Sequence, residues 1–291
     1  MAEPELLIGT AGWSYPDWAG VVYPGGERDK LGFLARYLNC IEINSTFYRP
    51  PSARSSERWV ERVSHNPDFR FTAKLWQRFT HETSKPYSRT DVETFRAGLT
   101  PLKESGRLAG LLLQFPFTFR DAPSSRDLLR RLSEDFREFP RVLEVRDASW
   151  SEPDAVEYIS GLGLNLACLD MPMTKSSFRE WARVTGDLGY LRLHGRNRAA
   201  WFSKEAGRDD RYNYLYSKDE LDRIVSRVGD LQNLAKRLVV IWNNHFRGKA
   251  AVNAFQTLQR LLKRKVSVPP LLVEAYPELE SVARPEGDKL F

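Results

Sequence analysis

The sequence predicts an α/β protein of the (β/α)₈ barrel class, in which parallel strands alternate with helices. About eight short apolar runs are spread from end to end of the chain, as expected for parallel strands that are covered on both faces. Apolar residues at helical spacing fill most of the gaps, which indicates βα units. Most runs end on a polar or charged residue, as expected at a barrel mouth. The rival arrangement is an open, doubly wound sheet.

The expected strands share a length of a few residues and a polar end. In chain order they span 6–9, 40–44, 69–74, 111–114, 142–146, 164–170, 190–194 and 238–245. Because the carboxyl ends of barrel strands meet at one mouth, we expect these polar side chains to converge there.

The expected helices are stripes of apolar residues between the strands. The stripes are Leu31, Leu34, Tyr37 and Leu38; Trp59, Val60 and Val63; Val92, Phe95, Leu99 and Leu102; Leu128, Leu129, Leu132 and Phe136; Val156, Ile159 and Leu162; Leu221, Ile224, Val225 and Val228; and Val252, Phe255, Leu258 and Leu262. Pro101 should bend or end its helix. Between the sixth and seventh strands only Phe178, Trp181 and Val184 recur at helical spacing, so a weak or missing helix is expected there.

The length of 291 residues fits a single barrel domain over 1–291, with the barrel at about 6–262. The tail at 263–291 is rich in proline and should wrap the barrel surface. With 42% hydrophobic residues, the chain can form a full core.

The net charge of +6 is not accompanied by a long basic run, so it does not indicate nucleic acid, although it suits an anionic ligand. Cys40 and Cys168 fall in strands far apart on a barrel, and two buried thiols fit a reducing cytoplasm. The first residues lack the features of a signal peptide, and no apolar stretch approaches the roughly 18 residues of a membrane span. We therefore expect a cytoplasmic protein without a membrane partner.

Side chains of a strand alternate between its two faces, which predicts which polar groups point into the barrel. If Ile41, Ile43, Leu143 and Val145 pack outward under the helices, their polar neighbours point inward. The predicted inward set is Glu42, Asn44, Glu144, Arg146, Arg192, His194, Asn243 and His245.

Carboxylates and imidazoles at strand ends are the parts of general acid–base catalysis. The candidate catalytic residues are Glu42, Glu144, Asp170, His194 and His245. Two other interpretations remain open. Glu42 could pair with Arg146 or Lys74, and Glu144 with Arg192, as structural ion pairs. One divalent ion could be held by Glu144, Asp170 and His194 or His245, although the chain has only 4 His and no metal-binding spacing. No cofactor is predicted.

Basic side chains at or just past strand ends form a second group, which should orient an anionic substrate. They are Lys74, Arg146, Arg192, Arg196 and Arg247. The loop at 246–250 leads into a helix, where barrels often bind phosphate, and Gly248 would let the backbone approach an anion. An ordinary tight turn with solvated side chains is the alternative.

Amide and aromatic side chains complete the predicted site. Asn44, Gln114, Asn243 and Asn244 should fix hydroxyl or carbonyl groups, and Trp13 and Tyr15 should contact the substrate. The long, charged and aromatic segment at 195–211 suits a loop that covers the substrate. Most of the aromatic rings are expected to pack over the barrel rim instead.

Five segments together resemble a known family. They are IGTAGWSY at 8–15, EINSTFY at 42–48, FTAK at 71–74 with TH at 80–81, LHGR at 193–196 and NNHFRGKA at 243–250. This pattern is similar to the YecE-like domain-of-unknown-function family (domain of unknown function 72), over about 8–262. The resemblance implies a (β/α)₈ barrel and no particular reaction. That barrel is loosely similar to metal-dependent sugar isomerases and apurinic endonucleases, which transfers no function.

The sequence contains no P-loop, dinucleotide-binding, serine-hydrolase or paired-cysteine motif. The main hypothesis is an enzyme of hydrolase, isomerase or lyase type that applies acid–base chemistry to a phosphate-bearing or otherwise anionic small molecule at the barrel mouth. The alternatives are a protein that binds or processes nucleic acid and a non-catalytic barrel that binds a metabolite.

Overall fold

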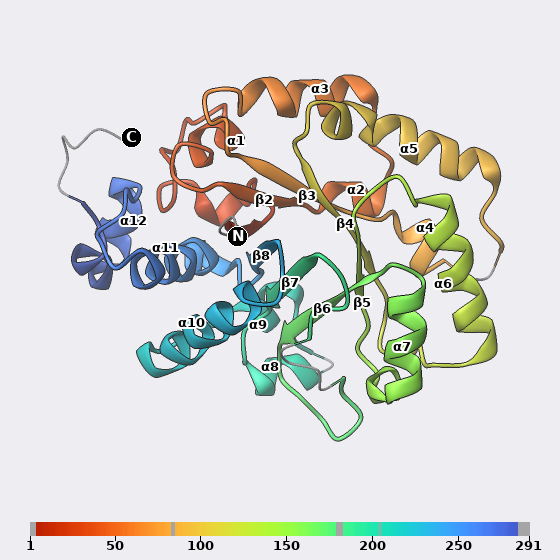
Figure 1. The fold of residues 1–291 in the computed structure, drawn as a ribbon. Helices are drawn as coiled ribbons and strands as arrows, with labels where there is room; N and C mark the ends of the chain where they lie inside the picture. Colours follow the sequence, from red (N-terminus) through yellow and green to blue (C-terminus); the bar gives the residue numbers. More distant parts are fainter. Residues whose placement is uncertain (1–3, 83–84, 179–182, 204, 285–291) are drawn as a thin grey trace.

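The computed structural model describes residues 4–82, 85–178, 183–203 and 205–284, and its centre is a closed barrel of parallel strands (Figure 1). The strands are β1 (Glu5–Ala11), β2 (Cys40–Ile43), β3 (Arg70–Lys74), β4 (Leu108–Gln114), β5 (Arg141–Glu144), β6 (Asn165–Asp170), β7 (Leu188–Leu193) and β8 (Arg237–Trp242). β8 pairs with β1 from Glu5↔Arg237 to Thr10↔Trp242, which closes the ring. The predicted barrel class is therefore confirmed, and the open sheet is wrong.

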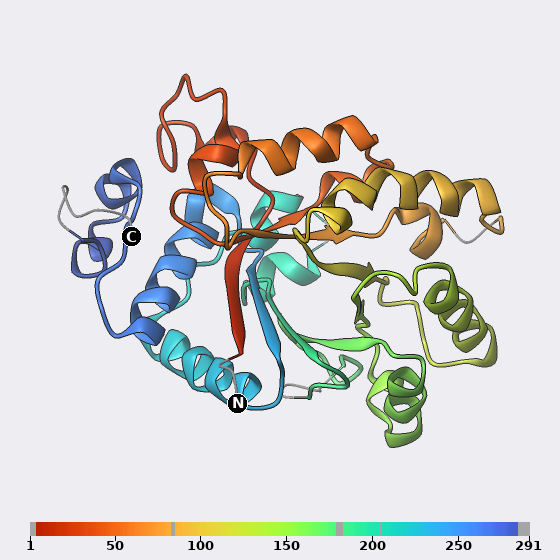
Figure 2. The ribbon, with the colours of Figure 1, turned by 45° about the horizontal axis from the view of Figure 1, so that its top comes forward.

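The long helices cover the outside of the ring (Figure 2). They are α3 (Ala53–Arg62), α5 (Arg89–Glu104), α6 (Pro123–Asp135), α7 (Pro153–Gly161), α10 (Lys218–Gln232) and α11 (Lys249–Leu262). α1 (Lys30–Leu34) is shorter than its predicted stripe, because Tyr37 and Leu38 lie beyond its end. α5 does not end at Pro101 but continues to Glu104. Pro101 has no N–H to donate to the carbonyl four residues earlier, so the helix continues through it with one backbone hydrogen bond fewer.

Short helices lie in the loops and in the C-terminal segment. They are η1 (Pro16–Trp18), α2 (Ser45–Tyr48), α4 (Gln77–Thr80), η2 (Ala148–Ser151), α8 (Arg198–Phe202), α9 (Arg208–Tyr212), η3 (Phe246–Gly248), α12 (Pro270–Ala275) and η4 (Pro277–Ser281). No helix in the described part of the chain is long and apolar enough to span a membrane.

The connection between β6 and β7 has no helix over 171–178 or 183–187, in agreement with the prediction. Phe178 is buried, and its backbone N–H donates to the Arg146 carbonyl at 2.8 Å. Residues 177 and 178 therefore lie against the loop that follows β5. Trp181, which contributed to the expected weak helix, lies outside the described residues.

The two faces of the barrel wall are buried in separate apolar clusters. Cys40, Val142 and Tyr190 belong to the cluster inside the ring. Ile41, Ile43, Leu143 and Val145 belong to the larger cluster between strands and helices, as the alternation predicted. The polar residues at the ends of β2 and β5 therefore point into the barrel.

The C-terminal segment lies outside the barrel, next to the loop after β8 (Figure 2). The hydroxyl of Tyr276 donates to the Arg247 carbonyl at 2.7 Å, and a parallel bridge joins Val266 to Ala283. The Tyr276 hydrogen bond attaches the segment to the loop after β8, and the bridge joins two parts of the segment to each other.

Candidate functional site

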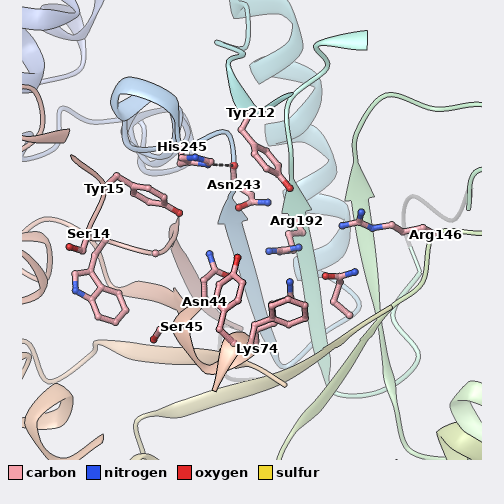
Figure 3. Close-up of a pocket in the computed structure, with 15 residues that line it drawn as sticks. Ser14, Tyr15, Asn44, Ser45, Lys74, Arg146, Arg192, Tyr212, Asn243 and His245 are labelled. Carbon is pink, nitrogen blue, oxygen red and sulfur yellow. Dashed lines mark hydrogen bonds between the residues drawn. The ribbon is translucent and has the colours of Figure 1, made fainter. Parts of the chain in front are cut away.

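A cavity of about 260 Å³ opens at the carboxyl ends of the strands, and we call it the mouth cavity (Figure 3). Its walls come from β1, β2, β3, β4, β5, β7 and β8 or from the loops that follow them. The lining residues are Gly12, Trp13, Ser14, Tyr15, Asn44, Ser45, Phe47, Tyr48, Lys74, Gln114, Arg146, Arg192, Tyr212, Asn243 and His245. This volume suits a small metabolite.

Arg192 is the central group of the cavity floor. Its Nε and Nη2 donate to the two carboxylate oxygens of Glu42 at 3.0 and 2.6 Å, and its Nη1 donates to Glu144 at 2.8 Å. Both carboxylates have no exposed surface, and Arg192 is 3% exposed. Glu42 therefore pairs with Arg192, not with Arg146 or Lys74 as the sequence suggested. The predicted pairing of Glu144 with Arg192 is confirmed.

The network extends from this floor in two directions. Arg146 donates to Glu144 Oε1 from both Nε, at 3.1 Å, and Nη2, at 2.8 Å. On the other side, Tyr190 donates its hydroxyl to Glu42 at 2.8 Å. Two of the five N–H donors of Arg146 are thus engaged by Glu144, and the side chain also lines the cavity.

The electrostatic balance keeps the Glu144 carboxylate ionised. Burial by itself raises the pKa of Glu144, but the charges of Arg192 and Arg146 outweigh it and hold this pKa well below its usual range. Burial by itself lowers the pKa of Arg192, but the charges of Glu42 and Glu144 outweigh it and raise this pKa. A carboxylate held so firmly in its ionised form is a poor proton acceptor, so Glu144 acts here as a counter-ion.

Lys74 extends from the end of β3 into the cavity, where it faces Arg192 (Figure 3). Its Nζ lies 3.8 Å from the centroid of the Phe47 ring. Among the described residues no carboxylate forms an ion pair with it, since Glu42 and Glu144 face the arginines. Burial, followed by the charge of Arg192, lowers the pKa of Lys74 to about 7. Close to half of the molecules would then carry a neutral amine near neutral pH.

His194 lies under the cavity and does not line it. Its Nδ1 accepts a hydrogen bond from the Asn243 amide at 3.0 Å, and its Nε2 lies 3.8 Å from Glu144 Oε1. Burial lowers the pKa of His194 well below its usual range. The ring is therefore neutral and fixes the orientation of Asn243, which does line the cavity.

His245 forms a side wall together with aromatic rings. It stacks on Tyr15 with the ring centroids 4.4 Å apart and lies 5.1 Å from the ring of Tyr212. Its Nε2 is 3.3 Å from Asp209 Oδ1. The indole of Trp18 donates to the His245 carbonyl at 2.7 Å, which fixes the backbone at this position.

Asp170 and Arg196 pair with each other outside the mouth cavity. Leu169 points into the barrel, so Asp170 points to the other face of the wall. There its carboxylate accepts two hydrogen bonds from the guanidinium of Arg196 and one from the Tyr216 hydroxyl at 2.7 Å. It is therefore turned away from Glu144 and from the imidazole of His194. In the described part of the chain, no three His, Cys, Asp or Glu side chains converge as metal ligands.

Asn244, Arg247 and Gly248 also lie outside the cavity. The Asn244 amide donates to the Tyr214 carbonyl and to Asn253, both at 2.8 Å. The backbone N–H of Arg247 donates to the Asp17 carboxylate, so a protein group already occupies this turn. Gly248 has φ 82, and an added Cβ would lie 2.9 Å from Val22. Both the backbone conformation of the turn and the packing against Val22 therefore favour a glycine at position 248.

Several lining residues were not among the sequence candidates. Ser14, Ser45, Phe47 and Tyr48 belong to the motif segments at 8–15 and 42–48, which were the available signal. Tyr212 lies directly after the segment predicted to cover the substrate, and it lines the cavity. Of the predicted substrate-binding residues, the cavity contains Trp13, Tyr15, Asn44, Lys74, Gln114, Arg146, Arg192 and Asn243.

Known proteins are similar to this chain in sequence, and a solved structure is similar to it in fold. A DUF72 family protein from Thermotoga maritima MSB8, solved by crystallography, is 33% identical, with a TM-score of 0.78 over 89% of this chain and 99% of that chain. The UPF0759 protein YunF of Bacillus subtilis (strain 168) is 29% identical over 88% of this chain and 94% of its own length. The UPF0759 protein YecE of Escherichia coli (strain K12) is 30% identical over 45% of this chain and 46% of its own length. The family model described as "protein of unknown function DUF72" matches residues 7–277. The chain therefore belongs to the DUF72 family.

Proposed function

We propose that this protein is an enzyme that binds a small anionic substrate in the mouth cavity and applies acid–base chemistry to it. The supporting observation is the charge balance of the cavity. Lys74, Arg146 and Arg192 line it, and their only carboxylate neighbours in the described network, Glu42 and Glu144, are buried behind the arginines. The two arginines balance the two carboxylates, and Lys74 in its protonated form adds a positive excess on the side that faces the ligand.

Arg146 is the group best suited to receive a carboxylate or a phosphate. Its guanidinium is less buried than that of Arg192, at 15% side-chain exposure against 3%, and it has donors that Glu144 does not use. Asn44, Gln114 and Asn243 add amide groups for hydroxyl or carbonyl oxygens. This combination supports a substrate with an anionic end and polar substituents.

Lys74 is the group best suited to transfer a proton. A general acid or base works best when its pKa lies near the working pH, and the pKa of Lys74 is lowered to about 7. Glu42 and Glu144 are less suited to this role, since each is bound by an arginine. His245 lines the opposite wall and is the second candidate for proton transfer.

The anion site can be tested with inorganic phosphate as the probe, by thermal unfolding at constant ionic strength. We expect phosphate to raise Tm of the wild type, by about 2–4 °C for each kcal/mol of binding. Arg146→Gln should lose most of this shift. Arg130→Gln, which changes a half-exposed arginine on α6, should keep it. Equal Tm shifts in all three proteins, or no Tm shift in any of them, would contradict the proposed anion site.

Turnover can be tested by NMR with a panel of phosphorylated and carboxylated metabolites. Lys74→Ala should abolish any reaction that the wild type performs, because it removes the proton-transfer group. Lys236→Ala is the matched control, since Lys236 is 79% exposed and precedes β8 at the end of the barrel opposite the mouth. A reaction that is as fast in Lys74→Ala as in the wild type would contradict the proposed role.

A further inference from the structure

We propose that Lys74 is a covalent nucleophile, which forms an imine with the aldehyde or ketone group of an anionic carbonyl compound bound in the mouth cavity. This inference rests on the proposed function, because it uses the same anion site. It adds the substrate class and a covalent step.

The first argument is the position of the amine. Lys74 is the last residue of β3, so a rigid strand carries its backbone, and its side chain reaches the cavity from the wall. Its Nζ lies over the Phe47 ring at 3.8 Å. The ring of Phe47 covers one side of the amine, and both side chains line the space where a ligand would bind.

The second argument is the set of charges around it. A structural lysine is normally paired with a carboxylate, but both carboxylates of this network are bound by Arg192 and Arg146. Lys74 instead lies beside these cations. Removal from water and a neighbouring cation are the two conditions that convert a lysine into a nucleophile. The resulting pKa of about 7 is consistent with that geometry.

The third argument is that other residues of the mouth cavity can bind the remaining groups of a carbonyl substrate. Arg146 can hold a carboxylate or phosphate of the ligand while Lys74 meets its carbonyl carbon. Asn44 and Asn243 line the same space and can bind the carbonyl oxygen or a hydroxyl. The cavity of about 260 Å³ has room for a short carbonyl compound of this kind.

The step balances without a further reactant. The neutral Nζ attacks the carbonyl carbon and forms a C–N bond, and a proton moves from nitrogen to the former carbonyl oxygen. The carbinolamine then loses that oxygen as water, and a C=N bond replaces the C=O bond. Only amine and carbonyl are consumed, and water is the only by-product.

The test is reductive trapping of the whole protein with pyruvate and sodium cyanoborohydride at pH 7, followed by peptide mass spectrometry. We expect one stable adduct on the peptide that carries Lys74. At this pH about half of a lysine population with a pKa near 7 is neutral, against about one in 3,000 for an ordinary lysine. Labelling of Lys74 should therefore exceed that of exposed lysines such as Lys236 by a factor on the order of 1,000.

Two variants and one neutral ketone sharpen the result. Lys74→Arg keeps the charge but cannot form an imine, so its adduct should vanish, whereas Lys236→Arg should label as the wild type does. Acetone offers the same methyl ketone without a charge. After correction for the reactivity of each ketone toward free Nα-acetyllysine, pyruvate should be preferred, and Arg146→Gln should reduce this preference.

The outcomes separate the two proposals. Phosphate binding without any adduct from pyruvate, glyoxylate or dihydroxyacetone phosphate would overturn the imine and leave the anion site standing. Labelling spread evenly over the lysines would overturn it as well. Because mass spectrometry locates the adduct in the wild type, the result does not depend on whether Lys74→Arg folds.

Discussion

Arg192 and Glu42 form a bidentate ion pair across the barrel, with a shortest N–O distance of 2.6 Å and almost no exposed surface on either side chain. β8 and β1 lie between β7 and β2 in the ring, so this pair crosses part of the barrel interior. The ion pair that forms the floor of the cavity therefore also contributes to the stability of the barrel.

Glu42→Gln should destabilise the protein by about 3 kcal/mol, since it leaves much of the buried charge of Arg192 without its partner. Urea unfolding at pH 7 would measure the change. Glu134→Gln is the control, because Glu134 is 69% exposed and should change stability by less than about 0.5 kcal/mol. A loss below about 1 kcal/mol for Glu42→Gln would show that the network adapts to the missing charge.

Lys74 should destabilise the folded protein at and below pH 7, and this destabilisation should disappear as the pH rises toward 10.5. Its pKa is about 7 in the folded protein, against 10.5 for a lysine in water, so the unfolded chain binds more protons between these values. Stability due to this group therefore rises as pH increases from 7 to 10.5. Lys74→Met should be more stable than the wild type by about 4 kcal/mol at pH 7, with the advantage shrinking toward pH 10. A constant difference across this window, measured by urea unfolding, would contradict the lowered pKa.

His194 should remain neutral well below pH 6.5, the usual pKa of an imidazole in water, with its proton on Nε2. The hydrogen bond from Asn243 to Nδ1 requires this tautomer. Nitrogen NMR of the imidazoles over an acid titration would report both properties. Asn243→Asp places a negative charge against the ring and should raise the pKa of His194. Protonation of His194 at an ordinary pH in the wild type would show that the ring is solvated.

Gly248→Ala should destabilise the protein by about 1–3 kcal/mol, because its φ of 82 disfavours a side chain and an added Cβ would lie 2.9 Å from Val22. Gly229→Ala is the matched control on α10, where nothing lies within 4 Å of an added Cβ. That change should stabilise the helix by up to about 1 kcal/mol. Equal effects in thermal unfolding would mean that the turn before α11 relaxes freely.

Side-chain alternation predicted which residues of β2 and β7 point inward, because polar side chains there share one parity. The same reasoning fails for β6. Its polar residues, Asn165 and Asp170, differ in parity, so only one of them can point inward. Since parallel strands are buried on both faces, the apolar residues do not decide the question. The interior position of Leu169 shows that Asp170 points away from the cavity.

The ion-pair partner of each buried charge was harder to predict than whether its side chain points into the barrel. Glu42 meets Arg192 from a strand that is not its neighbour, a contact that depends on the radius of the ring and on the length of each side chain. Periodicity in a sequence reports neither quantity. The loop at 246–250 shows the same limit, since the group that occupies its N–H is Asp17, about 230 residues away in the chain.

The contact between Tyr15 and His245 bears on when the protein becomes reactive during its synthesis. Tyr15 follows the first strand and His245 follows the last, so this wall exists only after β8 has closed against β1. A ribosome-bound chain that lacks β8 already contains Lys74, but in an open setting where its amine stays protonated. The order of the strands thus delays any chemistry of that lysine until the whole barrel has been made.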